Sequence, residues 1–220
     1  MKRHFLLFAS MAIASFSFAQ KTSIGIKMGV TSATMKGEAV SSLKNLIEYT
    51  NGAITTENRT GLFGGVNLNI PISEQVSIEP GLYYTQKGYA LRGALNMKGM
   101  EIINANARAQ LNSHYIDLPV VVKGNFGGLQ VFAGPQVSYL AKADLRTSAG
   151  ILGFNVLNKT MDATEQLNKW DAGITGGLGY QFKNGFNLTA SYDHGLSKAD
   201  ANQNFDAYNR AFKVGAGFKF

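Results

Sequence analysis

The stretch WDAGITGGLGYQF, residues 170–182, decides the fold of this chain. Its even positions, from Trp170 to Phe182, carry apolar side chains apart from Gly176, whereas its odd positions are polar or glycine. Successive side chains of a β-strand point to opposite faces. The stretch therefore predicts a strand with one apolar face and one face that is polar or small.

Other segments of the chain repeat this period of two: residues 24–30, 62–70, 76–85, 115–123, 129–143, 186–196 and 212–220. The alternation is least clean in 129–143, because Phe132 and Leu140 fall on the polar side. Pro80, Pro119 and Pro135 each remove a backbone hydrogen-bond donor, so we expect bulges or local irregularities near them. Together with residues 170–182 these segments predict an even number of strands, eight.

The links between the segments alternate in length along the chain. The short links are about 71–75, 125–128 and 183–185, and the long links are about 37–59, 93–112, 147–169 and 198–209. A transmembrane β-barrel has short periplasmic turns and longer outer loops, whereas a soluble barrel has no reason to place its long loops at one end. We therefore predict an all-β fold, an eight-stranded antiparallel up-and-down transmembrane β-barrel with short periplasmic turns and four longer outer loops.

Aromatic residues stand near the ends of the apolar faces: Trp170, Tyr180, Phe182, Phe186, Tyr192 and Phe218. Aromatic girdles of this kind mark the two interfaces of a bilayer, so we expect outer-membrane lipid around the barrel. The same rings could fill the core of a soluble periplasmic barrel, and this alternative stays open.

The first residues have the pattern of an export signal. A basic start is followed by the apolar run 5–18, and Ser17-Phe18-Ala19 supplies the small residues of a cleavage site between Ala19 and Gln20. The apolar run is short for a membrane-spanning helix, which needs about 20 residues. We expect residues 1–19 to be a cleaved signal peptide, residues 20–220 to form one barrel domain, and the protein to reside in the cell outer membrane.

Composition excludes several classes of function. Cysteine is absent, which excludes disulfides and thiolate chemistry. The net charge is +7, but lysines and arginines are scattered singly, so we expect no nucleic-acid partner. No apolar run of about 18 residues follows the signal, so no transmembrane helix is predicted there.

The polar faces place many charges toward the expected lumen: Lys27, Glu79, Lys87, Asp117, Lys123, Asp171, Asp193, Lys213 and Lys219. A barrel of eight strands is only wide enough for side chains to fill it, and buried charges must be paired. We predict a structural, salt-bridged plug in which Glu79, Asp117 and Asp171 face lysines. A selective path for ions or solutes is the alternative.

No constellation for catalysis, a metal or a cofactor emerges. His114 and His194 lack metal-ligand spacing, and we expect no metal and no cofactor. Ser191, Asp193 and His194 lie close together, but neighbouring residues of a strand face opposite ways. We therefore predict a protein that is not an enzyme.

Several of these segments resemble the outer-membrane β-barrel domain common in Bacteroidetes, described as PorT-like. The resemblance rests on "GLFGGVNLNIPI" (61–72), "VSIEPGLYYTQKGY" (76–89), "YIDLPVVVKGNF" (115–126), "VFAGPQVSYLAKA" (131–143) and "GLGYQFKNGFNLTASYDHGLSKA" (177–199). It implies an outer-membrane barrel and supplies no catalytic residues. Phe220, preceded by Phe218, resembles the signal that the barrel-assembly machinery reads during biogenesis.

These observations favour a small outer-membrane barrel with a structural, adhesive or partner-binding role, presented by its outer loops to a possible protein partner. A PorT-like secretion accessory or a narrow solute channel is the alternative. A lipid-modifying enzyme and a soluble periplasmic barrel are less favoured.

Overall fold

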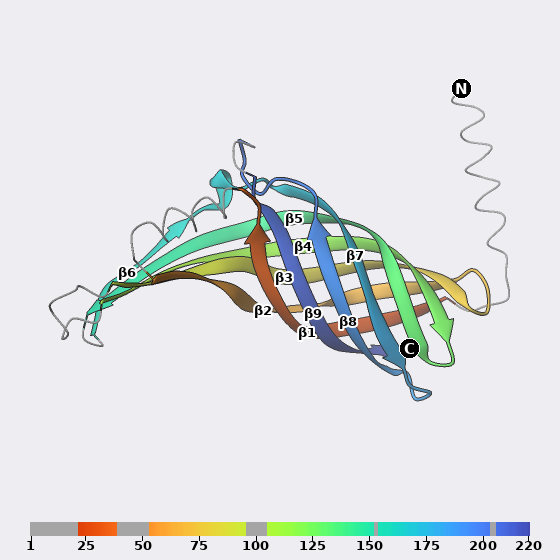
Figure 1. Ribbon diagram of the computed structural model, residues 1–220. Helices are drawn as coiled ribbons and strands as arrows, with labels where there is room; N and C mark the ends of the chain where they lie inside the picture. Colours follow the sequence, from red (N-terminus) through yellow and green to blue (C-terminus); the bar gives the residue numbers. More distant parts are fainter. Residues whose placement is uncertain (1–21, 39–52, 96–104, 152–153, 203–205) are drawn as a thin grey trace, which may run out of the picture.

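The computed structural model describes residues 22–38, 53–95, 105–151, 154–202 and 206–220. The expected cleavage site at Ala19 and Gln20 lies outside these residues. In the described part of the chain no helix is long and apolar enough to cross a membrane. The elements are β1 (Ser23–Lys36), β2 (Ala53–Pro71), β3 (Val76–Leu95), β4 (Ala105–Phe126), β5 (Leu129–Ile151), β6 (Phe154–Asp162), the 3-10 helix η1 (Thr164–Gln166), β7 (Trp170–Gln181), β8 (Phe186–Gly195) and β9 (Tyr208–Lys219) (Figure 1).

Eight of the described strands close into an antiparallel ring. β1 pairs with β2 on one side and with β9 on the other, and β4–β5 and β5–β7 pairings complete the circle. Closure leaves the ring without a free strand edge. The predicted eight-stranded barrel is confirmed.

The faces of the ring are inverted relative to a soluble barrel. Apolar side chains lie outside, as with Met28, which is 63% exposed, while Asp117 inside is fully buried. Ile24, Ile26, Val30, Leu62, Leu178, Val214 and many others share the outer face with Met28. An apolar exterior around a polar lumen is the arrangement of a transmembrane barrel.

The two ends of the barrel differ. Short turns at one end, which we call the inner end, join β2 to β3, β4 to β5 and β7 to β8. Gly127 and Gly128 form the β4–β5 turn with positive φ values of 60° and 102°. A two-residue hairpin turn with positive φ at both positions matches the strand twist, and glycine adopts it without strain. We call the opposite end, with the long links, the outer end.

The outer links contain more strand than the sequence predicted. Residues 93–95 and 105–112, expected to be loop, belong to β3 and β4, and β5 continues to Ile151. A ninth strand, β6, lies within the expected loop 147–169 and pairs with β5. These outer parts exceed the length that spans a membrane, so the apolar–polar alternation of a spanning strand is not required there.

The prolines interrupt the strand pairing without shifting its register. Pairing between β3 and β4 lapses between Pro80 and Tyr83 and resumes in the same register. Among the described strands, the register shifts lie elsewhere, for example at His114/Tyr115 opposite β5. The strands therefore tolerate proline by giving up single hydrogen bonds locally.

Candidate functional site

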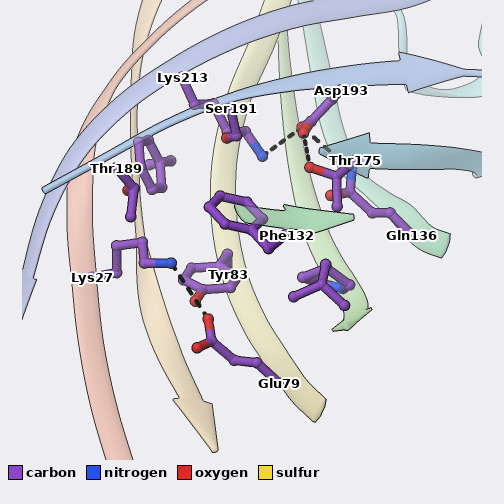
Figure 2. A pocket seen from close by; sticks show the side chains of 13 residues that line it. Lys27, Glu79, Tyr83, Phe132, Gln136, Thr175, Thr189, Ser191, Asp193 and Lys213 are labelled. Atoms are coloured by element: carbon purple, nitrogen blue, oxygen red, sulfur yellow. Dashed lines mark hydrogen bonds and ion pairs between the residues drawn. The ribbon is translucent and has the colours of Figure 1, made fainter. Parts of the chain in front are cut away.

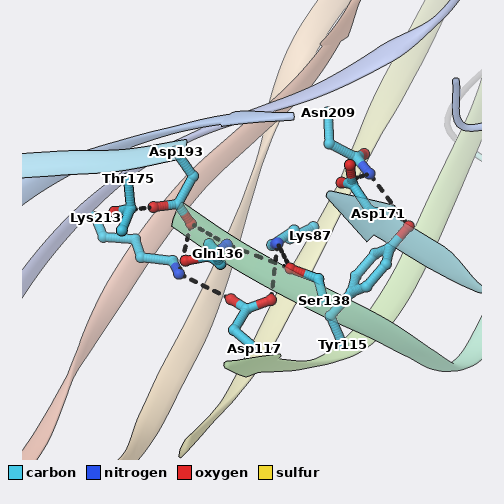
Figure 3. Close-up of polar contacts among 10 residues, drawn as sticks. All are labelled: Lys87, Tyr115, Asp117, Gln136, Ser138, Asp171, Thr175, Asp193, Asn209 and Lys213. Carbon is cyan, nitrogen blue, oxygen red and sulfur yellow. Dashed lines mark hydrogen bonds and ion pairs between the residues drawn. The ribbon is translucent and has the colours of Figure 1, made fainter. Parts of the chain in front are cut away.

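The centre of the lumen holds an ion-pair network (Figure 3). The carboxylate of Asp117 accepts from Lys87 Nζ and from Lys213 Nζ, each at 2.9 Å. Lys213 also pairs with Asp193 at 2.6 Å. Two lysines thus face two aspartates, and this balance of charge is what a buried network requires.

Neutral donors and acceptors complete the central network. Thr175 Oγ1 donates to Asp193 Oδ1 at 2.8 Å, and Lys87 Nζ donates to Ser138 Oγ at 3.2 Å. Lys87 also lies 4.8 Å from the centre of the Tyr115 ring. The central charges are therefore held by partners from several strands of the ring.

Asp171 is arranged differently from the prediction. Its Oδ2 accepts from Asn209 Nδ2 at 2.8 Å, and the same amide donates to Tyr115 Oη at 3.2 Å. Its other oxygen, Oδ1, is buried without a hydrogen-bond partner among the described residues. The expectation that Asp171 pairs with a lysine is wrong. β7 places its carboxylate beside Asn209, and it makes no ion pair with a described lysine (Figure 3).

A second group of charges lies toward the inner end. Glu79 pairs with Lys27 at 3.5 Å and with Lys123 more closely. Lys219, which the sequence placed with them, is exposed and makes no ion pair with any described side chain. The structure therefore brings Lys27, Glu79 and Lys123 together and leaves Lys219 at the mouth.

Aromatic rings separate the two groups of charges. Phe63, Tyr83 and Phe132 line a cavity of about 50 Å³ and lie within 6 Å of the cations of Lys27 or Lys213, measured to the ring centres. Figure 2 shows Tyr83 and Phe132 pointing inward. A Cβ at Gly215 would lie 2.6 Å from the ring of Phe63, so glycine in the wall makes room for that ring. Aromatic rings inside the lumen were not predicted from the sequence. The position of Phe132 on the polar side of its segment is a feature that could have indicated them.

The outer end of the lumen is filled by apolar side chains. Met35, Leu111, Tyr115, Leu140, Ala143 and Ala199 form a buried cluster, against which Tyr89, Ala163, Leu167 and Ala207 pack. The segments after β6 and after β8 cover it and are joined by backbone hydrogen bonds such as Asn168 N to Ala199 O at 2.8 Å.

Outside the barrel, hydrogen bonds with the side chain and backbone of Thr164 hold the pKa of Asp162 below its ordinary value.

The aromatic residues expected in the girdles all lie on the outer surface. Trp170 and Tyr192 stand toward the outer end, and Trp170 packs against Tyr139 at 5.0 Å. The inner-end group comprises Tyr180, Phe182, Phe186, Phe218 and the terminal Phe220. Both ends of the apolar surface therefore carry aromatic rings at the level where a bilayer interface would lie.

The polar triplet of β8 is divided between two faces. Ser191 and Asp193 point into the lumen, whereas His194 lies on the outside beside Tyr192, 6.2 Å between ring centres. His114, also outside, hydrogen-bonds the hydroxyl of Tyr84. The three side chains of the β8 triplet are therefore not brought together into a nucleophile and base.

β2 to β5 continue past the ring as a projecting sheet, to which β6 is added (Figure 1). These four strands have 19 to 23 residues, against 10 to 14 in β1, β7, β8 and β9. A spanning strand needs about 9–11 residues, so about ten are in excess, or about 30 Å at the rise of an extended strand. Among the described strands, β6 has a neighbour on one side only.

Comparison with known proteins gives one family. Residues 18–201 match the model described as "Outer membrane protein beta-barrel domain". No curated protein matches the chain.

Solved structures with a similar chain path include three small proteins. Ail, the attachment invasion locus protein of Yersinia pestis, is 12% identical, with a TM-score of 0.43 over 91% of this chain and 100% of Ail. Neisserial surface protein A is 14% identical, with a TM-score of 0.41 over 91% of this chain and 100% of its own. OprG from Pseudomonas aeruginosa is 10% identical, with a TM-score of 0.35 over 91% of this chain and 97% of OprG.

Proposed function

Because the chain belongs to the outer membrane protein β-barrel domain family, we propose that this small outer-membrane barrel serves as a platform whose projecting sheet binds a partner outside the cell. One observation carries the proposal. The chain extends β2 to β5 far beyond what a membrane needs, while charges and apolar side chains fill the lumen. The proposed role is adhesive or partner-binding, and it is not catalytic.

The projecting sheet offers two features that suit a protein partner. The free side of β6 presents unpaired backbone groups, which another strand can join. Leu157 and Met161 on β6 are both about half exposed and lie on the same face, since alternate residues of a strand point the same way. Charges of both signs lie elsewhere on the projecting sheet, such as the Arg92–Glu57 pair between β3 and β2 at 2.9 Å, so the sheet is not defined by one sign of charge.

The outer parts of β3 and β4 pair with the part of β5 that carries β6. We therefore expect their removal to abolish adherence while leaving the barrel intact. In the variant, residues 91–109 are replaced by Asn-Gly, which joins the paired residues Ala90 and Gln110 through a two-residue hairpin turn. Cells producing wild type or this variant are compared for adherence to protein-coated and to bare polystyrene, and heat-modifiability on a detergent gel reports the fold.

A finer variant tests the face of β6. Leu157→Ser with Met161→Ser is expected to lower adherence at least twofold by removing apolar contact area, whereas Asn158→Ser with Thr160→Ser, on the other face, is the matched control. Equal adherence of all variants and the wild type would contradict the proposed role.

The channel alternative makes a different prediction for the wild-type protein. We expect no single-channel conductance in planar bilayers, because an eight-stranded lumen is filled by its side chains and the Leu140 cluster closes its outer end. Reproducible conductance steps would instead favour the narrow solute channel.

We further propose that the chain is a PorT-like barrel of the kind common in Bacteroidetes. Resemblance to the PorT-like barrels of Bacteroidetes supports an exported chain, cleaved between Ala19 and Gln20 and inserted by the barrel-assembly machinery through its terminal Phe220. Mass spectrometry of the N-terminus of the purified protein tests the cleavage. Loss of a secreted cargo on gene deletion would support the secretion-accessory alternative.

A further inference from the structure

The inner mouth of the lumen is a polar cup to which every strand of the ring contributes a side chain. Its cations are Lys27, Lys123 and Lys219, and Glu79 is the single carboxylate among its lining residues. Glu79 is already shared by Lys27 and Lys123, and Lys219 has no carboxylate partner among the described residues. The cup therefore carries an excess of positive charge, unlike the balanced centre of the lumen.

Amide side chains supply further polar groups around these cations. Asn67, Gln130 and Asn187 line the same cavity. Asn187 is only 8% exposed, and its Oδ1 has no hydrogen-bond partner in the described part of the chain. A buried amide oxygen without a partner is costly, and the Nδ2 of the same side chain is the group that can donate to an anion.

The walls are shaped to leave this space open. Gly217 stands behind the amide of Asn187, and Gly25 stands behind that of Asn67. A Cβ at either glycine would approach the Oδ1 of its amide to 2.8 Å. The enclosed part of the cavity is about 20 Å³, room for about one water-sized group. Lys219 lines it from the exposed mouth, so an anion would sit at the mouth with one oxygen in the cavity.

We propose that this cup binds a small oxyanion, a carboxylate or a phosphate, from the periplasmic side. Ammonium and amide N–H groups are the donors that such an anion needs, and charge-assisted hydrogen bonds are the stronger ones. The apolar cluster around Leu140 closes the outer end, so the cup is a dead-end binding site and not part of a path through the membrane. The inference is independent of the adhesive role proposed for the projecting sheet.

The test uses the full-length protein folded in detergent, at low salt and pH 7. Calorimetric titrations with inorganic phosphate and with acetate decide which oxyanion binds. Saturable binding of either anion is expected, and it should weaken as sodium chloride is added because screening reduces the attraction.

Lys219→Ala is the main variant, because its exposed side chain can be removed without leaving a buried charge. We expect it to weaken binding about tenfold, the loss of one charge-assisted hydrogen bond. Lys183→Ala is the matched control, since Lys183 is exposed on the β7–β8 turn at the same end but outside the cup. Asn187→Ala is expected to weaken binding as well, with heat-modifiability confirming that each variant is folded.

The outcomes separate cleanly. Binding that is weakened by Lys219→Ala and unchanged by Lys183→Ala supports the cup. The proposal is overturned if neither anion binds saturably, or if the two lysine variants lose the same amount of affinity.

Discussion

Replacement of Val214 by arginine is expected to lower the free energy of unfolding by about 2–4 kcal/mol when the protein is folded in lipid vesicles. Val214 lies near the middle of β9, points outward, and is flanked by Val30 of β1 and Ala190 of β8. A guanidinium at this depth would have to leave water for hydrocarbon. Urea titration of the vesicle-inserted protein, followed by tryptophan fluorescence, measures the change.

The control for this prediction is Leu196→Arg. Leu196 is 58% exposed, against 47% for Val214, but it follows the end of β8 at the outer rim. A charge near the interface costs about 0–1 kcal/mol. Similar small effects at both positions would contradict a bilayer around the mid-barrel surface, because an exposed valine in water tolerates arginine.

The second large effect is expected from Asp117→Leu, which should lower the free energy of unfolding by about 3–5 kcal/mol. Asp117 is fully buried and receives both Lys87 and Lys213. Without it Lys213 keeps Asp193, whereas Lys87 keeps the hydroxyl of Ser138 and the ring of Tyr115 but no carboxylate among the described residues. The same urea titration measures the loss, and a weakened barrel should also unfold at a lower temperature on a detergent gel.

A second substitution shows whether the unpaired lysine is the cause. Asp117→Leu combined with Lys87→Met removes the charge that the first change leaves alone, and we expect it to restore about half of the lost stability or more, since apolar replacement of a whole buried pair is often neutral. Glu57→Gln, which breaks the exposed pair with Arg92, should cost at most about 1 kcal/mol. A double variant no more stable than Asp117→Leu would place the defect in packing instead.

Much of the barrel follows from local features of the sequence. The alternation in residues 170–182 is a property of strand geometry, in which side chains two positions apart share a face. The short links are also local, and two adjacent glycines suffice to make the turn at Gly127 and Gly128. These features predicted the ring of eight strands and the side of each strand that faces the lumen.

The strands beyond the membrane escaped this reasoning. β6 and the outer parts of β3 and β4 exceed the length that spans a membrane, so they are not required to alternate polar and apolar residues as a spanning strand does. The same limit hid the apolar cluster at the outer end, because Ala163, Leu167 and Ala199 come from links without a period. Only pairing with β5 and packing over Leu140 reveal that these segments are ordered parts of the fold.

The sequence by itself determined which side chains of a strand share a face, because that depends only on the period of two within each strand. The tertiary structure alone decided which inward charges meet. Lys213 and Asp117 are 96 positions apart and Lys87 and Asp117 are 30 apart, and their contact depends on the stagger of strands around the closed ring. That stagger sets Asp171 beside Asn209 instead of a lysine, balances the charges at the centre, and leaves the lysines of the inner mouth in excess.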